Sequence, residues 1–130
     1  MLTRLAYVSH ALIPTHDAQM LEIARQSLRN NARLGITGAL YFDGNQFFQV
    51  LEGSDAAIAV VFDSIRADPR HCDVQVVCHG PIAQRLFSDW SMKFVDGQTH
   101  RDLANAFRYE QVVQHGWAAQ QSRIEALAAA

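Results

Sequence analysis

Short apolar runs bounded by turn-forming residues recur along the chain, a pattern that is typical of β-strands. Five such runs predict strands, at residues 5–9, 39–42, 47–51, 74–78 and 90–95. The second and third runs are separated by Asp43-Gly44-Asn45, a strong signal for a hairpin turn. Neighbouring side chains of a strand point to opposite faces, so Leu5, Tyr7 and Ser9 are expected to share one face of the first strand.

Apolar residues also recur at steps of three and four, which is the period of a helix that packs on one side. One helix is expected from a cap at Thr15 or Asp17 to about Asn31, because Pro14 breaks the preceding strand. Its packed side is expected to consist of Met20, Ile23, Ala24, Ser27, Leu28 and Asn31.

A second helix is expected to begin at Ser54 or Asp55 and to stop at the Asp68-Pro69 pair. Its packed face is expected to consist of Ile58, Val61, Phe62 and Ile65. Two further helices are expected towards the C-terminus, one after Thr99 and an alanine-rich one after Gly116.

The predicted elements follow the order β-α-β-β-α-β-β-α-α. The split β-α-β arrangement at the start favours the α+β class and, within it, a ferredoxin-like sandwich. Such a fold here has a five-stranded mixed sheet, two core helices on one face, and a C-terminal helical extension. With 130 residues, the chain is expected to form one core, since single domains commonly have about 100–150 residues.

The composition argues against several classes of protein. Hydrophobic residues make up 49% and charged residues 18% of the chain, a balance that is typical of a globular domain. The net charge of −2 argues against nucleic acid or an anionic membrane as the main partner. There is no apolar run of the roughly 20 residues that span a membrane, and no signal-peptide pattern at the N-terminus. The chain is therefore expected to be cytoplasmic, with Cys72 and Cys78 reduced and too far apart on one strand for a disulfide.

The common catalytic and metal-binding motifs are missing from the sequence. The six histidines include no pair at ligand spacing with a carboxylate, so no metal site is expected. There is no GxSxG motif, and Cys78 lies in a predicted strand, where a thiol is usually inert packing. The glycine-rich loops that bind dinucleotides or phosphates are also lacking. By these motifs, the chain is not expected to be an enzyme.

Three polar residues lie at positions that should belong to the core. Gln49 shares a strand face with Phe47 and Leu51, although a buried amide without partners costs about 1–3 kcal/mol. Tyr7 lies in the first strand, and Asn31 lies at the end of the first helix. The simpler interpretations are a strand-edge glutamine, a core tyrosine and a helix-capping asparagine.

The same three residues are also able to converge on the interface between the sheet and the helices. Ile23 and Ile65, one from each core helix, would then flank a flat ligand. The polar side chains would bind the heteroatoms of that ligand by hydrogen bonds. This second interpretation predicts a planar, heteroatom-rich ligand held between two helices.

Six stretches of the sequence resemble the BLUF family, the blue-light sensors that use FAD. They are LAYVS at 5–9, SLRNN at 27–31, GITGAL at 35–40, FFQVLEG at 47–53, DPRH at 68–71 and RLFSDWSM at 85–92. The stretches follow the order and spacing of the family across about residues 1–97. The resemblance implies a flavin-binding core at 1–97, with FAD between the two core helices, and a helical interaction segment at 98–130.

The resemblance also implies roles for individual residues. Tyr7 would be the electron and proton donor, and Gln49 would bridge Tyr7 and the N5 and C4=O edge of the flavin. Asn31 would bind the carbonyl–imide edge of the ring. Trp90 and Met92 would occupy the strand beside Gln49 and transmit its change. The implied FAD-binding residues are Tyr7, Ile23, Asn30, Asn31, Phe47, Gln49, Ile65, Arg70 and His71.

The mechanism implied by the resemblance is a rearrangement and not a turnover. After blue-light excitation of the noncovalently bound flavin, Tyr7 gives up an electron and a proton. Gln49 is left rotated or tautomerised, the absorption shifts slightly to the red, and this state decays in the dark. Arg70 and His71 resemble the positions near the ribityl and phosphate chain, where donor groups suit an anion.

The remaining 33 residues leave no room for an output domain, so the expected partner is a separate effector protein. The tail carries Trp117, Ile124 and Leu127, which predict an interface and a homo-oligomer, and Lys93 is expected to be a solvated charge. Two alternatives stay open, a small ferredoxin-like enzyme of the acylphosphatase type and a flavin-free structural module. The first needs an arginine-bearing phosphate loop after the first strand, which residues 10–14 do not provide.

Overall fold

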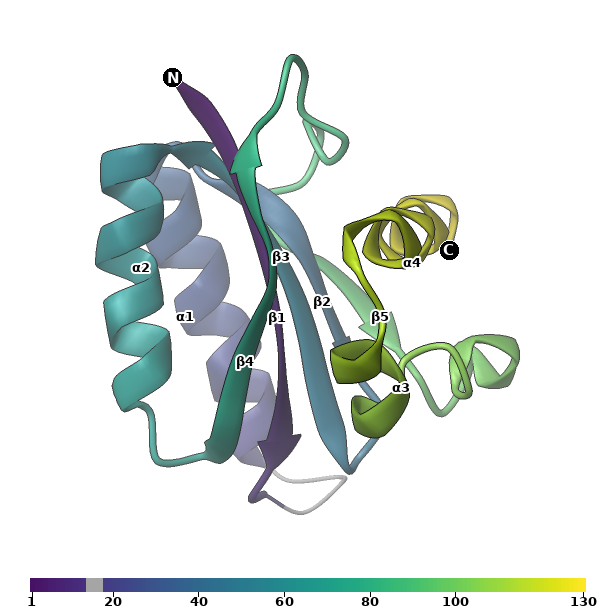
Figure 1. Ribbon diagram of the computed structural model, residues 1–130. Coiled ribbons are helices and arrows are strands. Elements are labelled where there is room, and N and C mark those ends of the chain that lie inside the picture. Colours follow the sequence, from purple (N-terminus) through teal and green to yellow (C-terminus); the bar gives the residue numbers. More distant parts are fainter. Residues whose placement is uncertain (14–17) are drawn as a thin grey trace.

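The computed structural model describes residues 1–13 and 18–130, which form a sheet with helices on both faces (Figure 1). The strands are β1 (Leu2–Ala11), β2 (Thr37–Phe42), β3 (Gln46–Ser54), β4 (His71–Pro81) and β5 (Lys93–Asp96). The helices are α1 (Ala18–Leu34), α2 (Asp55–Ala67), α3 (Tyr109–Gln114) and α4 (Trp117–Ala129), with a 3-10 turn at Arg101–Leu103.

The five strands form one mixed sheet in the order β4-β1-β3-β2-β5. β1 lies between β3 and β4 and is antiparallel to both, β2 is antiparallel to β3, and β5 is parallel to β2. The register pairs Tyr7 directly with Gln49. The predicted ferredoxin-like α+β sandwich with a five-stranded mixed sheet is therefore confirmed.

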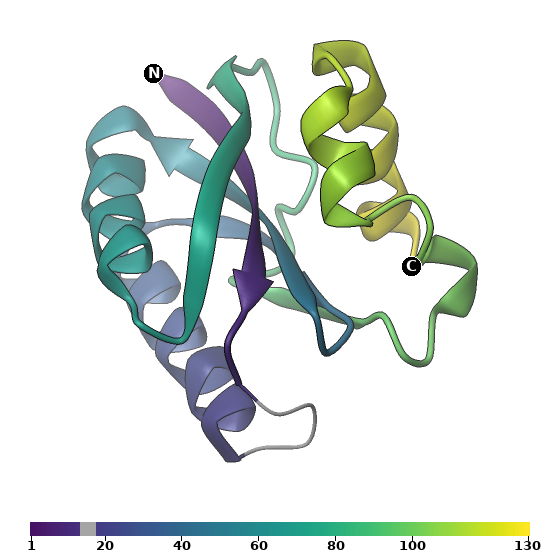
Figure 2. The same cartoon turned by 60° about the horizontal axis from the view of Figure 1, so that its bottom comes forward.

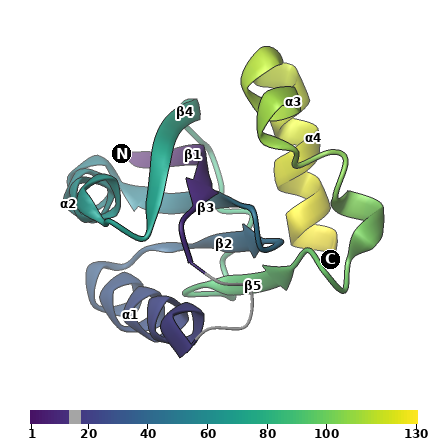
Figure 3. The same ribbon diagram turned by 90° about the horizontal axis from the view of Figure 1, so that it is seen from below.

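The two faces of the sheet carry different pairs of helices. α1 and α2 cover one face, and α3 and α4 lie on the other (Figures 1 and 3). Seen from a second direction, the C-terminal helices remain on the far side of the sheet from α1 and α2 (Figure 2). The odd-numbered residues of β1 and β3, such as Leu5 and Leu51, belong to the first core, under α1 and α2.

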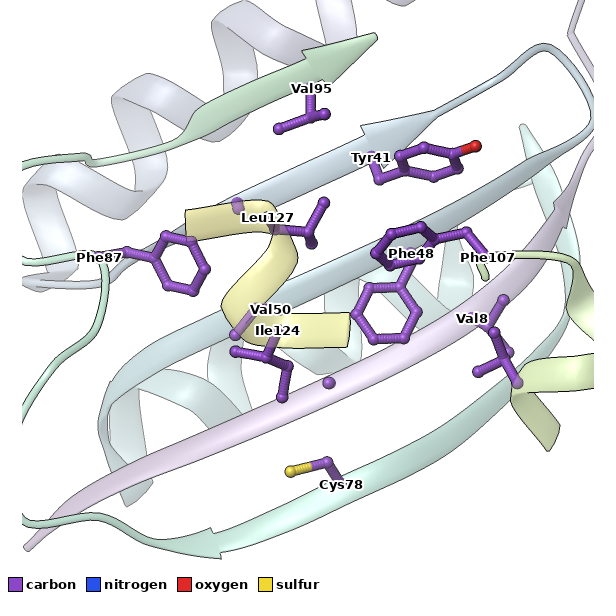
Figure 4. Packing of buried hydrophobic residues seen from close by; sticks show 13 residues of the cluster. Val8, Tyr41, Phe48, Val50, Cys78, Phe87, Val95, Phe107, Ile124 and Leu127 are labelled. Atoms are coloured by element: carbon purple, nitrogen blue, oxygen red, sulfur yellow. The ribbon is translucent and has the colours of Figure 1, made fainter. Parts of the chain in front are cut away.

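The second core lies between the sheet and the C-terminal helices. Phe107, Ile124 and Leu127 pack there against Phe48 and Tyr41 of the sheet (Figure 4). Ile124 and Leu127, which the sequence assigns to an intermolecular interface, are thus buried against the chain's own sheet. The side chain of Trp117 is not among those that the structure describes.

The boundaries of the first two helices have clear local causes. Ser54 caps α2 by accepting a hydrogen bond from the backbone N–H of Ala57, as one of the two predicted caps. α1 continues past the predicted end at Asn31 to Leu34, where Gly35 adopts a φ of 69° that favours glycine. The predicted caps at Thr15 and Asp17 lie outside the described residues.

Two sequence predictions about packing are wrong in detail. Leu28, expected on the packed side of α1, is exposed, whereas Ile23, Ser27 and Asn31 of the same predicted side line the cleft. The predicted strand at 90–95 begins only at Lys93, so Trp90 and Met92 lie in the irregular segment 82–92. That segment is held by hydrogen bonds to the buried side chain of Glu52, and by one backbone hydrogen bond from Gly38 of β2 to Trp90.

Two features are absent from residues 1–13 and 18–130. In this part of the chain, none of the helices combines the length and apolarity that crossing a bilayer requires. No three His, Cys, Asp or Glu side chains there come together as ligands of a metal ion. Cys72 and Cys78 are both free thiols, and burial raises the pKa of the Cys78 thiol.

Candidate functional site

A cleft opens between α1, α2 and the face of the sheet that carries Tyr7 and Gln49. Its void of about 170 Å³ far exceeds the roughly 10–15 Å³ that a single water needs by the same measure. Ile23 of α1 and Ile65 of α2 line its two sides. The cleft is therefore large enough for part of a small organic ligand, with apolar walls on both helices.

Tyr7 and Gln49 form a buried hydrogen-bonded pair at the base of the cleft. The Tyr7 hydroxyl donates to Gln49 Oε1 at 2.5 Å. Both side chains come from directly paired positions of β1 and β3, so the register of the sheet fixes their contact. Burial, and to a smaller extent the charge of Asp68, raises the pKa of Tyr7 above its ordinary value. The phenol is therefore held protonated, as a donor to the amide.

The amide nitrogen of Gln49 donates only to a weak hydrogen-bond acceptor. Its Nε2 lies 3.8 Å from the sulfur of Met92, and a thioether is a poor acceptor. An amide nitrogen carries two N–H donors. Gln49 thus has donor capacity at the base of the cleft that a ligand with oxygen or nitrogen acceptors can use.

Asn31 supplies a second buried amide from α1. Its side chain is 1% exposed, and its Nδ2 donates to the backbone oxygen of Ser91 at 2.9 Å. Asn31 lies inside the helix, so the interpretation as a capping residue is wrong. Asn30 is exposed at the rim of the cleft. The two amides that face the cleft, Asn31 and Gln49, are thus both tied to the segment that carries Ser91 and Met92.

His71 forms part of the wall of the cleft. Its Nε2 lies 2.6 Å from the carbonyl oxygen of Ile65, and its Nδ1 lies 2.7 Å from the Ser9 hydroxyl. A carbonyl only accepts, so Nε2 carries the proton and Nδ1 accepts from the serine. Its ring packs edge-on against Tyr7 and Phe47. Both nitrogens are therefore used within the protein, and the expected place of His71 near a phosphate chain stays a prediction.

Arg70 lies at the mouth of the cleft and is held by an acidic neighbour. Its guanidinium donates to both carboxylate oxygens of Asp68, with the shortest contact at 2.5 Å, and to Gln26 Oε1 at 3.1 Å. This ion pair lowers the pKa of Asp68 and raises that of Arg70. The guanidinium is thereby oriented along the rim of the cleft.

All nine residues predicted to bind the cofactor line this cleft, including Phe47 beside Gln49. Their roles in binding stay predictions. The sequence analysis did not predict the other lining residues as ligand contacts, namely Gln26, Ser27, Arg33, Leu34, Leu40, Val60, Val61, Ser64 and Asp68. Helical spacing from Ile23 and Ile65 gives a signal for several of them, whereas Leu40 is recognisable only once the strand order is known.

Met92 and Trp90, expected side by side on one strand face, lie in different surroundings. Met92 is 6% exposed and belongs to the first core, next to Gln49. Trp90 is 48% exposed and does not line the cleft. The expectation that both residues lie on a strand beside Gln49 is wrong, because the strand starts after them.

Glu52 holds the segment that carries these residues, a role with no clear signal in the sequence. Its carboxylate is fully buried and forms an ion pair of 2.7 Å with Arg4. It also accepts from the backbone N–H groups of Leu86 and Phe87, both at 2.9 Å. Segment 82–92 is thereby fastened to β1 and β3, which places Ser91 and Met92 against the cleft amides.

A family model with the description BLUF, sensors of blue-light using FAD, matches residues 2–93. The photoactivated adenylate cyclase subunit beta of Euglena longa is 39% identical over 94 residues, 71% of this chain and 11% of that protein. The blue light- and temperature-regulated antirepressor BluF of Escherichia coli (strain K12) is 34% identical over 101 residues, 77% of this chain and 25% of the relative. The chain thus spans a minor part of the length of both relatives.

Solved structures match a larger share of the chain. The dark-state structure of the BLUF protein BlrB is 39% identical, with a TM-score of 0.75 over 80% of this chain and 79% of that one. The ground state of BlsA is 29% identical, with a TM-score of 0.85 over 100% of this chain and 89% of that one. The likeness to BlsA therefore includes the C-terminal helices, and the resemblance seen in the sequence is confirmed.

Proposed function

The chain belongs to the BLUF family of blue-light sensors, and we propose that its cleft binds FAD noncovalently and converts light absorption into a rearrangement around Gln49. Flavin use is a property of the family, and FAD in particular is part of the proposal. The domain is a sensor, and the proposed reaction is a reversible change of hydrogen bonding without turnover of a substrate.

The cleft residues fit a flat ring with a polar edge. Ile23 and Ile65 offer apolar surfaces from opposite helices, which suits the two faces of an isoalloxazine. The amides of Gln49 and Asn31 supply hydrogen-bonding groups for its heteroatom edge, and the Gln49 Nε2 is paired only weakly with sulfur. Arg70 at the mouth supports a ligand with an anionic tail, which favours FAD or FMN over riboflavin.

When bound, the flavin supplies absorption of blue light and, in its excited state, an acceptor for one electron and one proton. Tyr7 is the proposed donor of both, because its phenol is buried at the base of the cleft. Its hydroxyl donates to Gln49 Oε1 at 2.5 Å. The Gln49 amide therefore lies on the proposed path of the proton away from Tyr7. Both side chains of this pair are buried, so little water reaches their hydrogen bond to compete as a proton acceptor.

Gln49 is the proposed switch because a carboxamide has a donor end and an acceptor end. In the structure its oxygen faces Tyr7 and its nitrogen faces Met92. Rotation or tautomerisation changes which end meets each neighbour. The contact to Met92 then changes together with the contact to Tyr7. Segment 82–92, which carries Met92, is therefore in direct contact with the rearranging side chain.

The short hydrogen bond between Tyr7 and Gln49 at the base of the cleft is the observation that carries this proposal. The test is an absorption spectrum before and after blue light. The wild-type protein should be yellow, release FAD on denaturation and show a red shift that reverses in the dark. Tyr7→Phe and Gln49→Leu should retain flavin but lose the reversible shift.

Tyr41→Phe is a matched control for this test. Tyr41 is also a buried strand tyrosine, but it lies in the second core and donates its hydroxyl to Asp43. This variant should keep the full red shift. A full reversible shift in Tyr7→Phe would mean that oxidation of Tyr7 is not the trigger. Colourless wild-type protein after growth with adequate flavin would contradict cofactor binding itself.

The proposed output is contact with a separate effector protein or a change in self-assembly. Some relatives are named as photoactivated cyclase subunits, of which the chain matches about a tenth. The present residues match the sensory part of such proteins, and the proposal assigns the output to a separate protein. A pull-down from lysates of light-grown and dark-grown cells should capture different partners. Identical captures, with an unchanged elution volume in light and dark, would contradict this output.

A further inference from the structure

The chain contains one lysine, Lys93, and it lies directly after Met92. Its Nζ donates to the carbonyl oxygen of Ala128 at 2.8 Å and lies 5.6 Å from the ring centroid of Trp90. The sequence-based expectation of a solvated charge is therefore wrong. Lys93 connects the start of β5 to the last turn of α4.

The contact between Lys93 and the Ala128 carbonyl is favourable because of its place at the C-terminal end of a helix. The last carbonyl groups of a helix lack partners within the helix and lie at the negative end of its dipole. A lysine ammonium satisfies both conditions, and the face of Trp90 adds a cation–π contact. Lys93 is thus a cap supplied to α4 by a different element of the fold.

Although they are neighbours in the sequence, Met92 and Lys93 contact opposite sides of the sheet. Met92 lies in the first core, beside the amide of Gln49. Lys93 shares its face with Val95, which packs in the second core with Leu127 of α4 (Figure 4). One peptide bond therefore joins a side chain that contacts the proposed switch to a side chain that contacts α4.

We propose that Lys93 is a positioning residue that transmits the rearrangement of Gln49 through the sheet to the C-terminal end of α4. When the Gln49 amide turns its oxygen instead of its nitrogen towards Met92, Met92 and the peptide bond to Lys93 shift. The shift alters the contact between Lys93 Nζ and the Ala128 carbonyl, so the last turn of α4 changes its stability. This inference rests on the proposed function and adds the route and the site of the output.

Because the chain has one lysine, lysine labelled with ¹⁵N gives a single backbone amide signal and a single side-chain ammonium signal. In the wild-type protein, both should change between dark and blue light. Hydrogen exchange of the amides in the last turn of α4 should change by about two- to fivefold, the factor expected for a cation at a helix C-terminus. These measurements need no substitution and therefore do not depend on how a variant folds.

Lys93→Met keeps much of the apolar stem and removes the donor and the charge. It should retain the red shift but lose the light-dependent change in exchange at α4. Lys93→Arg keeps a cationic donor and should restore that change, whereas Arg101→Met, at an exposed cation of the C-terminal part, should leave it intact. A Lys93→Met protein with the full light response of α4 would overturn the inference.

The outcomes also separate this inference from the proposed function. A wild-type protein that shows the reversible red shift while the exchange of α4 is the same in light and dark overturns only the inference. A wild-type protein without any red shift overturns the proposed function, and the inference with it. A changed Lys93 signal together with a changed α4 supports both.

Discussion

Glu52 illustrates how one buried charge can organise segments that are distant in the sequence. Its carboxylate accepts hydrogen bonds from Arg4 in β1 and from the backbone of Leu86 and Phe87. The hydroxyl of Thr37 in β2 is a further donor. A buried ion pair contributes little net stability by itself, but breaking it leaves the partner charge uncompensated. Its importance therefore lies in fixing segment 82–92.

Glu52→Gln should destabilise the protein by about 3–5 kcal/mol, since Arg4 would remain buried without its counter-charge. Urea unfolding of the variant gives this value directly. Glu110→Gln, at an exposed position of α3, is the matched control and should change stability by less than about 0.5 kcal/mol. A Glu52→Gln protein as stable as the wild type would mean that the pair with Arg4 is dispensable.

The pair of Asp68 and Arg70 should give stability a dependence on pH. The pKa of Asp68 lies below its ordinary value of 3.8, so its contribution is complete above about pH 4. It is lost as the pH falls through the lower, folded-state pKa. Asp68→Asn should therefore cost about 0.5–1 kcal/mol at pH 7, and the difference from the wild type should vanish at low pH. Denaturant unfolding at pH 7, 5 and 3 measures this.

Asp63→Asn serves as the control for this pH dependence. Asp63 is exposed and lies 3.7 Å from Arg66, a distance typical of a weak surface pair. Its stability difference from the wild type should be small at every pH. If Asp68→Asn and Asp63→Asn gave the same profile, the bidentate contact of Arg70 would not stabilise the folded state.

At the residue scale, a functional residue can be predicted from the sequence when its polarity differs from that of its neighbours in the chain. Gln49 and Tyr7 are identifiable because a polar side chain among apolar strand neighbours requires a partner, and the structure brings the two together. Glu52 also lies in that strand, but its partners come from segments whose positions no local pattern specifies. The same holds for Lys93, whose partner is 35 residues away.

At the scale of elements, hydrophobic periodicity predicts α2 and the β2–β3 hairpin well, because each is formed by contacts that are local in sequence. The strand β5 is less predictable, since it needs a parallel partner, β2, that is more than 50 residues away in the chain. The apolar run at 90–95 suits a strand, but pairing begins only where Lys93 meets Ala39. Trp90 and Met92 therefore lie before the strand, and their side chains do not follow the alternation between sheet faces that the sequence pattern implies.

Met92 and Trp90 should consequently differ when each is shortened. Met92→Ala removes a buried side chain from the first core and should cost about 2–5 kcal/mol. Trp90→Ala removes a half-exposed ring and its contact with Lys93, and should cost about 1 kcal/mol. Thermal or urea unfolding distinguishes the two. Equal losses would indicate that Trp90 is buried in solution.

At the scale of the whole molecule, the sheet is covered on both faces, and different parts of the chain cover the two faces. The first core and the cleft are built from residues before Gly97. The second core depends on Phe107, Val112, Ile124 and Leu127, all from the C-terminal part. The proposed flavin site and the cover of the opposite face therefore come from different parts of the chain.

Removing residues 98–130 should leave every cleft residue in the chain but uncover the second core. Burial of one large apolar side chain contributes about 1.5–3 kcal/mol, so the loss of four such side chains amounts to about 6–12 kcal/mol. That is comparable to the whole net stability of a typical domain, about 5–15 kcal/mol. The truncated protein should therefore aggregate, or bind a hydrophobic dye strongly, instead of persisting as a folded monomer.

A graded variant separates the role of the C-terminal helices in stability from any role in the photochemistry. Ile124→Ala opens the second core without touching the cleft and should cost about 2–5 kcal/mol. Since the first core and the Tyr7–Gln49 contact lie on the other face of the sheet, this variant should retain bound flavin and its reversible red shift. Absorption spectra and urea unfolding of the same sample test both statements. A folded Ile124→Ala protein that had lost the red shift would mean that the packing of α4 helps to set the geometry of the cleft.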